Sequence, residues 1–240
     1  MSESQTQSPH AGDLTRRQML RSIALAITGV GSGGITLEAG RFIHSLAQEE
    51  AGQDGPYRPK FFSNHEFQTV SRLADLIIPA DDNSGSALEA GAPEFFDLLC
   101  SQNHELARIY TGGILWLDRT MEKVSGDSFV AAPLAAQHRV LLALAEEARA
   151  QEGKEREARN AKFHVAPRNQ GYLRDTGEPP SSLGPGGRFF VWVRHLTVDA
   201  FYTSPIGIKD VDYQGNGYWE RYRVPQEAID HALERSPFKS

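Results

Sequence analysis

His195 and Asp199 have a spacing that suits acid–base chemistry. They lie four positions apart in a stretch that predicts a helix, so the carboxylate could orient the imidazole ring as it does in many hydrolytic enzymes. An ordinary pair on a helix surface has the same spacing, so the structural interpretation stands beside the catalytic one. The other seven histidines are scattered singly, and no two histidines of this chain are four residues apart. A self-contained hydrolase or lyase that uses His195 and Asp199 is therefore one hypothesis.

The remaining motifs that carry chemistry are missing or incomplete. The chain has no Gly-x-Gly-x-x-Gly after a strand, no Gly-Lys-Ser/Thr loop and no Cys-x-x-Cys-His. Asp81, Asn83 and Glu89 faintly resemble a calcium loop, but Gly85 comes one place too early, so a turn accounts for them better. The single cysteine, Cys100, follows two leucines, which favours a buried apolar role over a nucleophilic one. We assign no catalytic residue, metal site or cofactor to this chain.

Charge and cysteine content exclude further classes. The 240 residues contain 25 Lys+Arg against 31 Asp+Glu, a net charge of -6, which argues against nucleic acid as a partner held by phosphate neutralisation. One cysteine allows no disulfide within a monomer. The length suffices for one sizeable core.

The first residues have the layout of an export signal. Arg16 and Arg17 precede a stretch without charged residues, 22–37, that is too short and too rich in glycine for a spanning helix. Paired arginines ahead of a weakly apolar segment resemble the signal of the twin-arginine pathway, which exports folded proteins. Small residues at 45 and 47 place the expected cleavage after Ala47. The expected division is a signal peptide, 1–47, and a helical domain, 48–240.

A second interpretation of this segment is a cytoplasmic amphipathic helix. Arg16, Arg17 and Arg21 would then form its solvated face, while Ile23 and its apolar neighbours at 25 and 27 would pack on a core. Four glycines between positions 29 and 34 make a continuous helix costly, at about 1 kcal/mol for each.

The rest of the chain predicts helices, because apolar residues recur at helical spacing and no alternating pattern is present. Ser63 and Glu66 form the signature of a capping box ahead of a helix that Pro79 ends. A second helix begins near Pro93, a third runs through Leu106 to Leu117, and a fourth runs from Pro133 through Ala148. The mixed charges of 152–159 indicate a solvated helix end. The fold class expected is all-α, a single helical domain with long loops.

The C-terminal third alternates between loops and helices. Nine of the 22 residues in 166–187 are Gly or Pro, so we expect no helix there, and either a binding loop or a connector. A helix is predicted over 188–203 and a last one over 225–234. Between them lies an expected non-helical tail whose aromatic residues either fold back on the domain or contact another chain. The candidate interface residues are Tyr202, Tyr213, Tyr218, Trp219 and Tyr222.

Three segments together resemble one family. They are FQTVSRLADLIIPADD at 67–82, AGAPEFFD at 90–97, and TVDAFYTSP at 197–205 followed by Gly207 and YQGN at 213–216. These blocks resemble the gluconate 2-dehydrogenase subunit 3 family, in which a twin-arginine leader is also typical.

The resemblance implies a non-catalytic small subunit of a periplasmic or membrane-associated dehydrogenase complex. It implies a partner, an FAD-dependent large subunit of the glucose–methanol–choline oxidoreductase type that oxidises a sugar or sugar acid and passes electrons to a cytochrome c or another acceptor. The small subunit would support folding and export of that partner, with Arg16 and Arg17 as export determinants. Besides the enzyme hypothesis above, a purely structural periplasmic protein is a further alternative.

Overall fold

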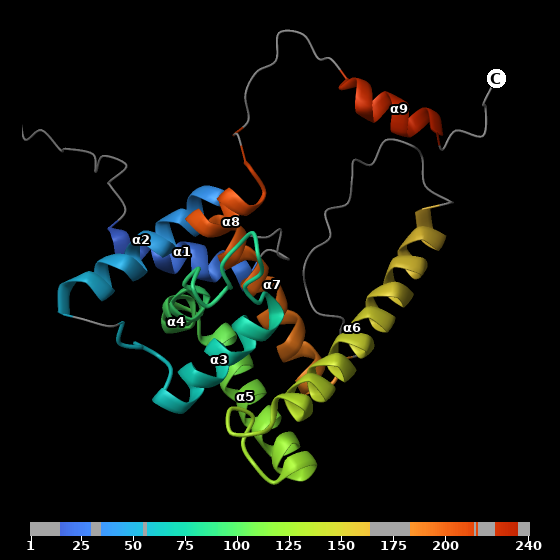
Figure 1. Ribbon diagram of the computed structural model, residues 1–240. Coiled ribbons are helices and arrows are strands. Elements are labelled where there is room, and N and C mark those ends of the chain that lie inside the picture. Colours follow the sequence, from blue (N-terminus) through green and yellow to red (C-terminus); the bar gives the residue numbers. More distant parts are fainter. Residues whose placement is uncertain are drawn as a thin grey trace, which may run out of the picture.

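The computed structural model describes residues 15–29, 35–54, 57–163, 183–213, 215 and 224–234. Within these ranges the only regular secondary structure is helical, which confirms the all-α class predicted from the sequence. The helices in the described ranges (Figure 1) are α1 (Arg16–Gly29), α2 (Leu37–Asp54), α3 (Asn64–Ile77), α4 (Ala92–Gln102), α5 (His104–Ser125), α6 (Leu134–Phe163), α7 (Pro185–Thr203), α8 (Pro205–Asp210) and α9 (Gln226–Glu234).

Helix α7 is the centre of the domain. It contacts α2, α3, α4, α5, α6 and α8, and Figure 1 shows it passing through the body of the molecule. Five consecutive residues, 189–193, are all buried, so this helix has apolar side chains around its whole circumference rather than along one stripe. The other helices can therefore bury their apolar faces against it from several sides.

Glycines set the distance between α5 and α7. A Cβ atom at Gly113 of α5 would lie 2.0 Å from the ring of Phe189, and a Cβ atom at Gly186 of α7 would lie 2.3 Å from the ring of Trp116. Each glycine thus receives an aromatic ring from the opposite helix. The two helices approach closely because these positions have no side chain.

Asp97 of α4 ties the segment before α3 to the core. Its carboxylate is fully buried and accepts four hydrogen bonds, one from the hydroxyl of Tyr57 at 2.8 Å and three from backbone N–H groups of Lys60, Phe61 and Phe62 at 2.7–2.9 Å. Burying a carboxylate is costly unless donors replace its water. These donors fix the path of the chain into α3.

Helix ends follow the signals seen in the sequence. The capping box is confirmed, with Glu66 N–H donating to the Ser63 hydroxyl and Ser63 N–H donating to the Glu66 carboxylate. Asn103 caps α5 by accepting from the backbone of Glu105 and Leu106. The predicted helix at Pro93 is α4. Asp81 accepts from the N–H groups of residues 83 and 84, the turn chemistry expected there.

Two segments predicted to be non-helical are helical. Residues 185–187 form the first turn of α7, where Pro185 loses no hydrogen bond and Gly186 admits Trp116. Residues 206–210 belong to α8, because the Ser204 hydroxyl accepts from Gly207 N–H and caps the new helix. At α8 the Ser204 cap overrides the low helix propensity of glycine, whereas α7 begins after Gly184 without a side-chain cap and has Pro185 at its first position. Leu183 and Gly184 are non-helical, as predicted, and residues 166–182 of the predicted loop lie outside the described residues.

Helix α1 packs against α4 through a narrow stripe. Leu20, Ala24 and Ile27 are buried, and the side-chain amide of the buried Asn103 donates to the Ala24 carbonyl at 2.6 Å. Arg16, Arg17 and Arg21 are exposed, as the amphipathic interpretation predicted, although Leu25 is exposed rather than packed. The helix ends at Gly29, where the glycines begin. No helix of the described residues has the length and apolar character needed to cross a membrane.

Helix α2 is more deeply buried in the domain than α1. Gly40, Ile43, His44 and Ala47 are buried against α4 and α7, at the helical spacing that forms one face. A Cβ atom at Gly40 would lie 2.2 Å from the Thr203 hydroxyl. The expected cleavage position after Ala47 falls in the middle of this helix. The division at residue 47 stays a prediction.

The close approach of α5 and α7 predicts opposite effects for two adjacent glycines. We expect Gly113→Ala to lower the free energy of unfolding by about 1–3 kcal/mol, because the new methyl group overlaps Phe189. Gly112→Ala has open space and should be neutral or should stabilise α5 by up to about 1 kcal/mol. Urea unfolding of both variants measures the difference. Equal stabilities would contradict the packing described here.

Candidate functional site

The corner between α7 and α8 positions a concave surface against α2. Ser204 fixes the corner, because its hydroxyl donates to the Phe201 carbonyl at 2.6 Å while accepting from Gly207 N–H at 3.1 Å. A Cβ atom at Gly207 would lie 2.1 Å from that same carbonyl oxygen, so the tight corner requires glycine. As a result α8 turns back toward α2 (Figure 1).

His44 connects α2 to α7 at the floor of this junction. Its Nε2 lies 2.8 Å from the carbonyl oxygen of Ala200, and its ring packs on Phe95 with ring centres 5.1 Å apart. A carbonyl only accepts, so Nε2 carries the proton. Burial lowers the pKa of His44, an effect that the bond to the carbonyl partly offsets. The residue acts as a neutral connector between the two helices.

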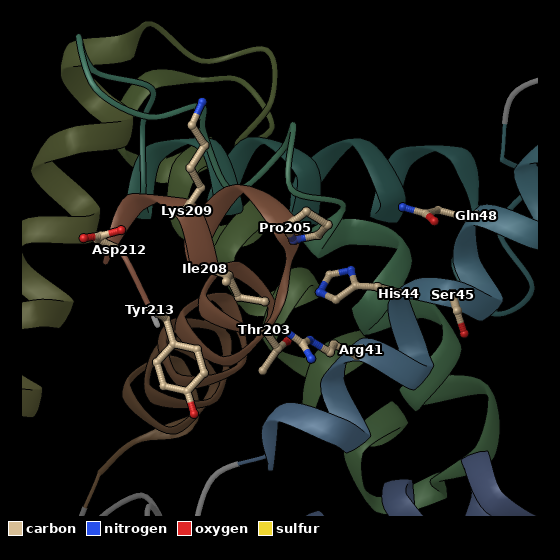
Figure 2. Close-up of a pocket in the computed structure, with 10 residues that line it drawn as sticks. All are labelled: Arg41, His44, Ser45, Gln48, Thr203, Pro205, Ile208, Lys209, Asp212 and Tyr213. Carbon is tan, nitrogen blue, oxygen red and sulfur yellow. The ribbon is translucent and has the colours of Figure 1, made fainter. Parts of the chain in front are cut away.

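A cavity of about 450 Å³ opens between α2 and α8. Figure 2 shows His44 and Arg41 reaching from α2 toward Thr203 and Ile208, while Lys209 extends away at the rim. The full lining consists of Arg41, His44, Ser45, Gln48, Thr203, Pro205, Ile208, Lys209, Asp212 and Tyr213. The lining is mixed, because it contains the cationic Arg41 and Lys209, the acidic Asp212 and apolar side chains.

A second cavity of about 290 Å³ adjoins the first and is mostly apolar. The two cavities share Thr203, Ile208 and Tyr213. The remaining lining of the second is Ile35, Leu37, Val198, Asp199, Tyr202 and Val211. We refer to the two cavities together as the α7–α8 groove. Its lining combines exposed valine and tyrosine side chains with the cationic side chains of Arg41 and Lys209.

Asp199 is the one acidic group in the apolar part of the groove. It is half-buried, and its Oδ2 accepts from the backbone N–H of Ile35 at 3.3 Å. Loss of solvent raises the pKa of Asp199 to about 6, although the bond from Ile35 acts in the opposite direction. The carboxyl group therefore changes charge near pH 6.

The structure gives His195 and Asp199 different neighbours. Nε2 of His195 lies 3.3 Å from the guanidinium of Arg194, which in turn binds Glu152 of α6. Asp199 instead holds the chain entering α2. The structural interpretation of the pair thus has contacts to support it, and the enzyme hypothesis stays a prediction.

The predicted interface residues divide into two groups. Tyr202 and Tyr213 are 42% and 43% exposed and line the groove, whereas Tyr218, Trp219 and Tyr222 lie outside the described residues. Arg16 and Arg17 are exposed on α1, and Arg16 forms an ion pair with Glu49 of α2. Cys100 is buried, as predicted, and burial raises the pKa of its thiol well above the ordinary value. The described residues contain no group of three potential metal ligands.

The contribution of α2 to the groove is not predicted from the sequence. The expected signal peptide includes Arg41 and His44, and the expected non-helical tail includes Lys209. A signal for α2 is nevertheless present, because positions 40, 43, 44 and 47 follow the spacing of one helix face.

The raised pKa of Asp199 predicts a pH-dependent stability. The folded state holds the proton up to about pH 6, whereas an unfolded aspartate loses it near 3.8, so the wild type loses stability as pH rises through this interval. Asp199→Asn has no such charge and should lack this loss. Urea unfolding at pH 4.5 and pH 7.5 tests this, with the exposed Asp210→Asn as a control that keeps the wild-type dependence. A pH profile of Asp199→Asn identical to the wild type would refute it.

Comparison with known proteins places the helical core in a family. The family model of gluconate 2-dehydrogenase subunit 3 matches residues 64–221, which include α3 through α8. No curated protein and no solved structure matches the chain. The matched range covers more than half of the 240 residues, and the chain belongs to the gluconate 2-dehydrogenase subunit 3 family.

Proposed function

We propose that this chain is a non-catalytic accessory subunit that binds an FAD-dependent sugar or sugar-acid dehydrogenase and is exported with it. The observation that carries the proposal is the family match over 64–221, because a subunit 3 implies partner subunits in a multi-subunit complex. The partner would be a large subunit of the glucose–methanol–choline oxidoreductase type that holds the FAD, with a cytochrome c subunit as a further candidate. The substrate would bind to that large subunit.

The export role rests on the arginine pair. Arg16 and Arg17 stand at the start of α1 with exposed side chains, where another protein can reach them. The twin-arginine pathway accepts folded cargo, so a partner without its own signal could leave the cytoplasm bound to this chain. Periplasmic localisation of both subunits follows from this mechanism.

The packing of α2 limits where a leader can end. Cleavage after Ala47 would remove Ile43 and His44 from the core and the Ile35 hydrogen bond from Asp199. Removal of α1 alone would leave these contacts intact. We therefore propose that the exported chain keeps α2 and that cleavage occurs ahead of Ile35.

Replacing the arginine pair tests the export mechanism. In cells that make both subunits, Arg16→Lys with Arg17→Lys should keep this chain and the flavoprotein in the cytoplasm, because the twin-arginine machinery requires the pair. Arg21→Lys, an exposed arginine of the same helix outside the pair, should export normally. Immunoblots of periplasmic and cytoplasmic fractions, with dehydrogenase activity in each, give the readout. Normal export of the flavoprotein with the double variant would remove the carrier role.

The end of the leader is read directly from the exported protein. N-terminal sequencing and intact mass of the chain purified from the periplasm should show a start at or before Ile35. A start at Gln48 would mean that the subunit functions without α2 and would refute the proposed boundary.

A further inference from the structure

We propose that the α7–α8 groove is the docking surface for an acidic segment of the partner subunit that also carries apolar side chains. The inference rests on the proposed function, since it assumes that a partner subunit exists. It adds the place of contact and the chemistry of the segment that binds there.

The apolar half of the groove has the composition of a binding surface. Val198, Tyr202, Val211 and Tyr213 are 39–52% exposed, and all four line the cavity of about 290 Å³. Large apolar side chains scattered singly over a surface are ordinary, whereas four that share one concave site mark a place where another molecule excludes water. Two of the four are tyrosines, which contribute large contact area at a low entropic cost.

The charged side chains beside the groove indicate the sign of the charge that the binding segment of the partner should carry. Arg41 and Lys209 line the cavity of about 450 Å³ from opposite helices, and both are exposed. Neither forms an ion pair with any residue in the part of the chain that the structure describes. The arginine fork suits a carboxylate in particular, since it can donate two parallel hydrogen bonds. A partner with carboxylates at this rim would complete the surface.

The acidic groups of the groove are already engaged in the chain itself. Asp199 accepts a hydrogen bond from the backbone N–H of Ile35. Asp212 at the rim also has an interaction of its own. The two cations therefore determine which partner charge the groove favours, and an acidic segment fits better than a basic one.

Charge reversal at the rim tests the inference. With the subunits expressed together, Arg41→Glu combined with Lys209→Glu should weaken binding of the flavoprotein about tenfold or more, and raising the salt concentration should weaken wild-type binding. Tyr213→Ala should weaken binding through lost apolar contact, with little dependence on salt. Arg108→Glu combined with Arg119→Glu, at two exposed arginines of α5, changes the net charge by the same amount; this matched control should bind as the wild type does. Surface plasmon resonance on purified subunits gives the affinities.

The outcomes separate this inference from the proposed function. If the wild-type chain binds no flavoprotein, the proposed function fails and the groove inference fails with it. If the wild type binds and the double reversal and Tyr213→Ala bind equally well, only the groove inference is overturned. Weakening of the same size by the Arg108→Glu and Arg119→Glu control would show a general charge effect and would also overturn it.

Two further measurements distinguish docking from a folding defect and from self-association. The charge-reversal variant should unfold at the wild-type temperature, because both rim cations are exposed and unpaired within the described ranges. If a variant unfolds at a lower temperature, amide hydrogen exchange of the wild-type chain replaces it as the test. The groove residues should then exchange more slowly when the partner is bound, and unchanged exchange would overturn the inference. The oligomeric state of the wild type and of Tyr213→Ala is the second measurement. If the wild type self-associates, and Tyr213→Ala dissociates it without changing flavoprotein binding, the groove binds a second copy of this chain and the inference is overturned.

Discussion

The structure depends on the burial of α7 on nearly all sides. A helix with apolar residues around its circumference must be covered by several neighbours at once, and these neighbours fit only if they approach closely. Glycines provide that approach. Gly113 of α5 and Gly186 of α7 let these two helices approach each other, and Gly40 lets α2 approach α7. The order of the helices around α7 is therefore limited by where these small residues occur along the chain. The groove forms because α7 ends at the corner fixed by Ser204, from which α8 turns back toward α2.

Buried polar groups then fix the register between elements, which apolar packing alone does not specify. Hydrophobic contact holds helices together without specifying their register, whereas a buried carboxylate or amide must meet its donors and acceptors at defined atoms. Asp97 does so for the segment that enters α3, and Asn103 does so twice, as the cap of α5 and as the donor to the Ala24 carbonyl of α1. His44 serves the same purpose between α2 and α7. Each of these residues joins two elements that are distant in sequence.

Local signals predict most of the helices, and long-range contacts account for what they miss. The capping box at Ser63 and the proline at 93 mark α3 and α4, because both signals act within one turn. The turn residues around Pro205 indicate a tail, and only the bonds of Ser204 to Phe201 and Gly207 reveal a second helix there. For the site, Tyr202 and Tyr213 are predicted from their type alone. Arg41 and His44 are not, because nothing local shows that α2 lies beside α7.

The N-terminal segment has to expose the arginine pair and also to complete the core. Helix α1 carries the arginine pair, and α2 carries most of the core contacts. Helix α1 buries the side chains of Leu20, Ala24 and Ile27, and the burial of a leucine or isoleucine contributes about 1.5–3 kcal/mol. The side-chain amide of Asn103 adds hydrogen bonds to the Ala24 carbonyl and the Thr28 hydroxyl of this helix. Helix α2 has the fully buried Ile43, the His44 bond and the glycine contact to Thr203. Helix α1 packs mainly on α4, whereas α2 packs on both α4 and α7, which is the reason for proposing a leader that ends between the two helices.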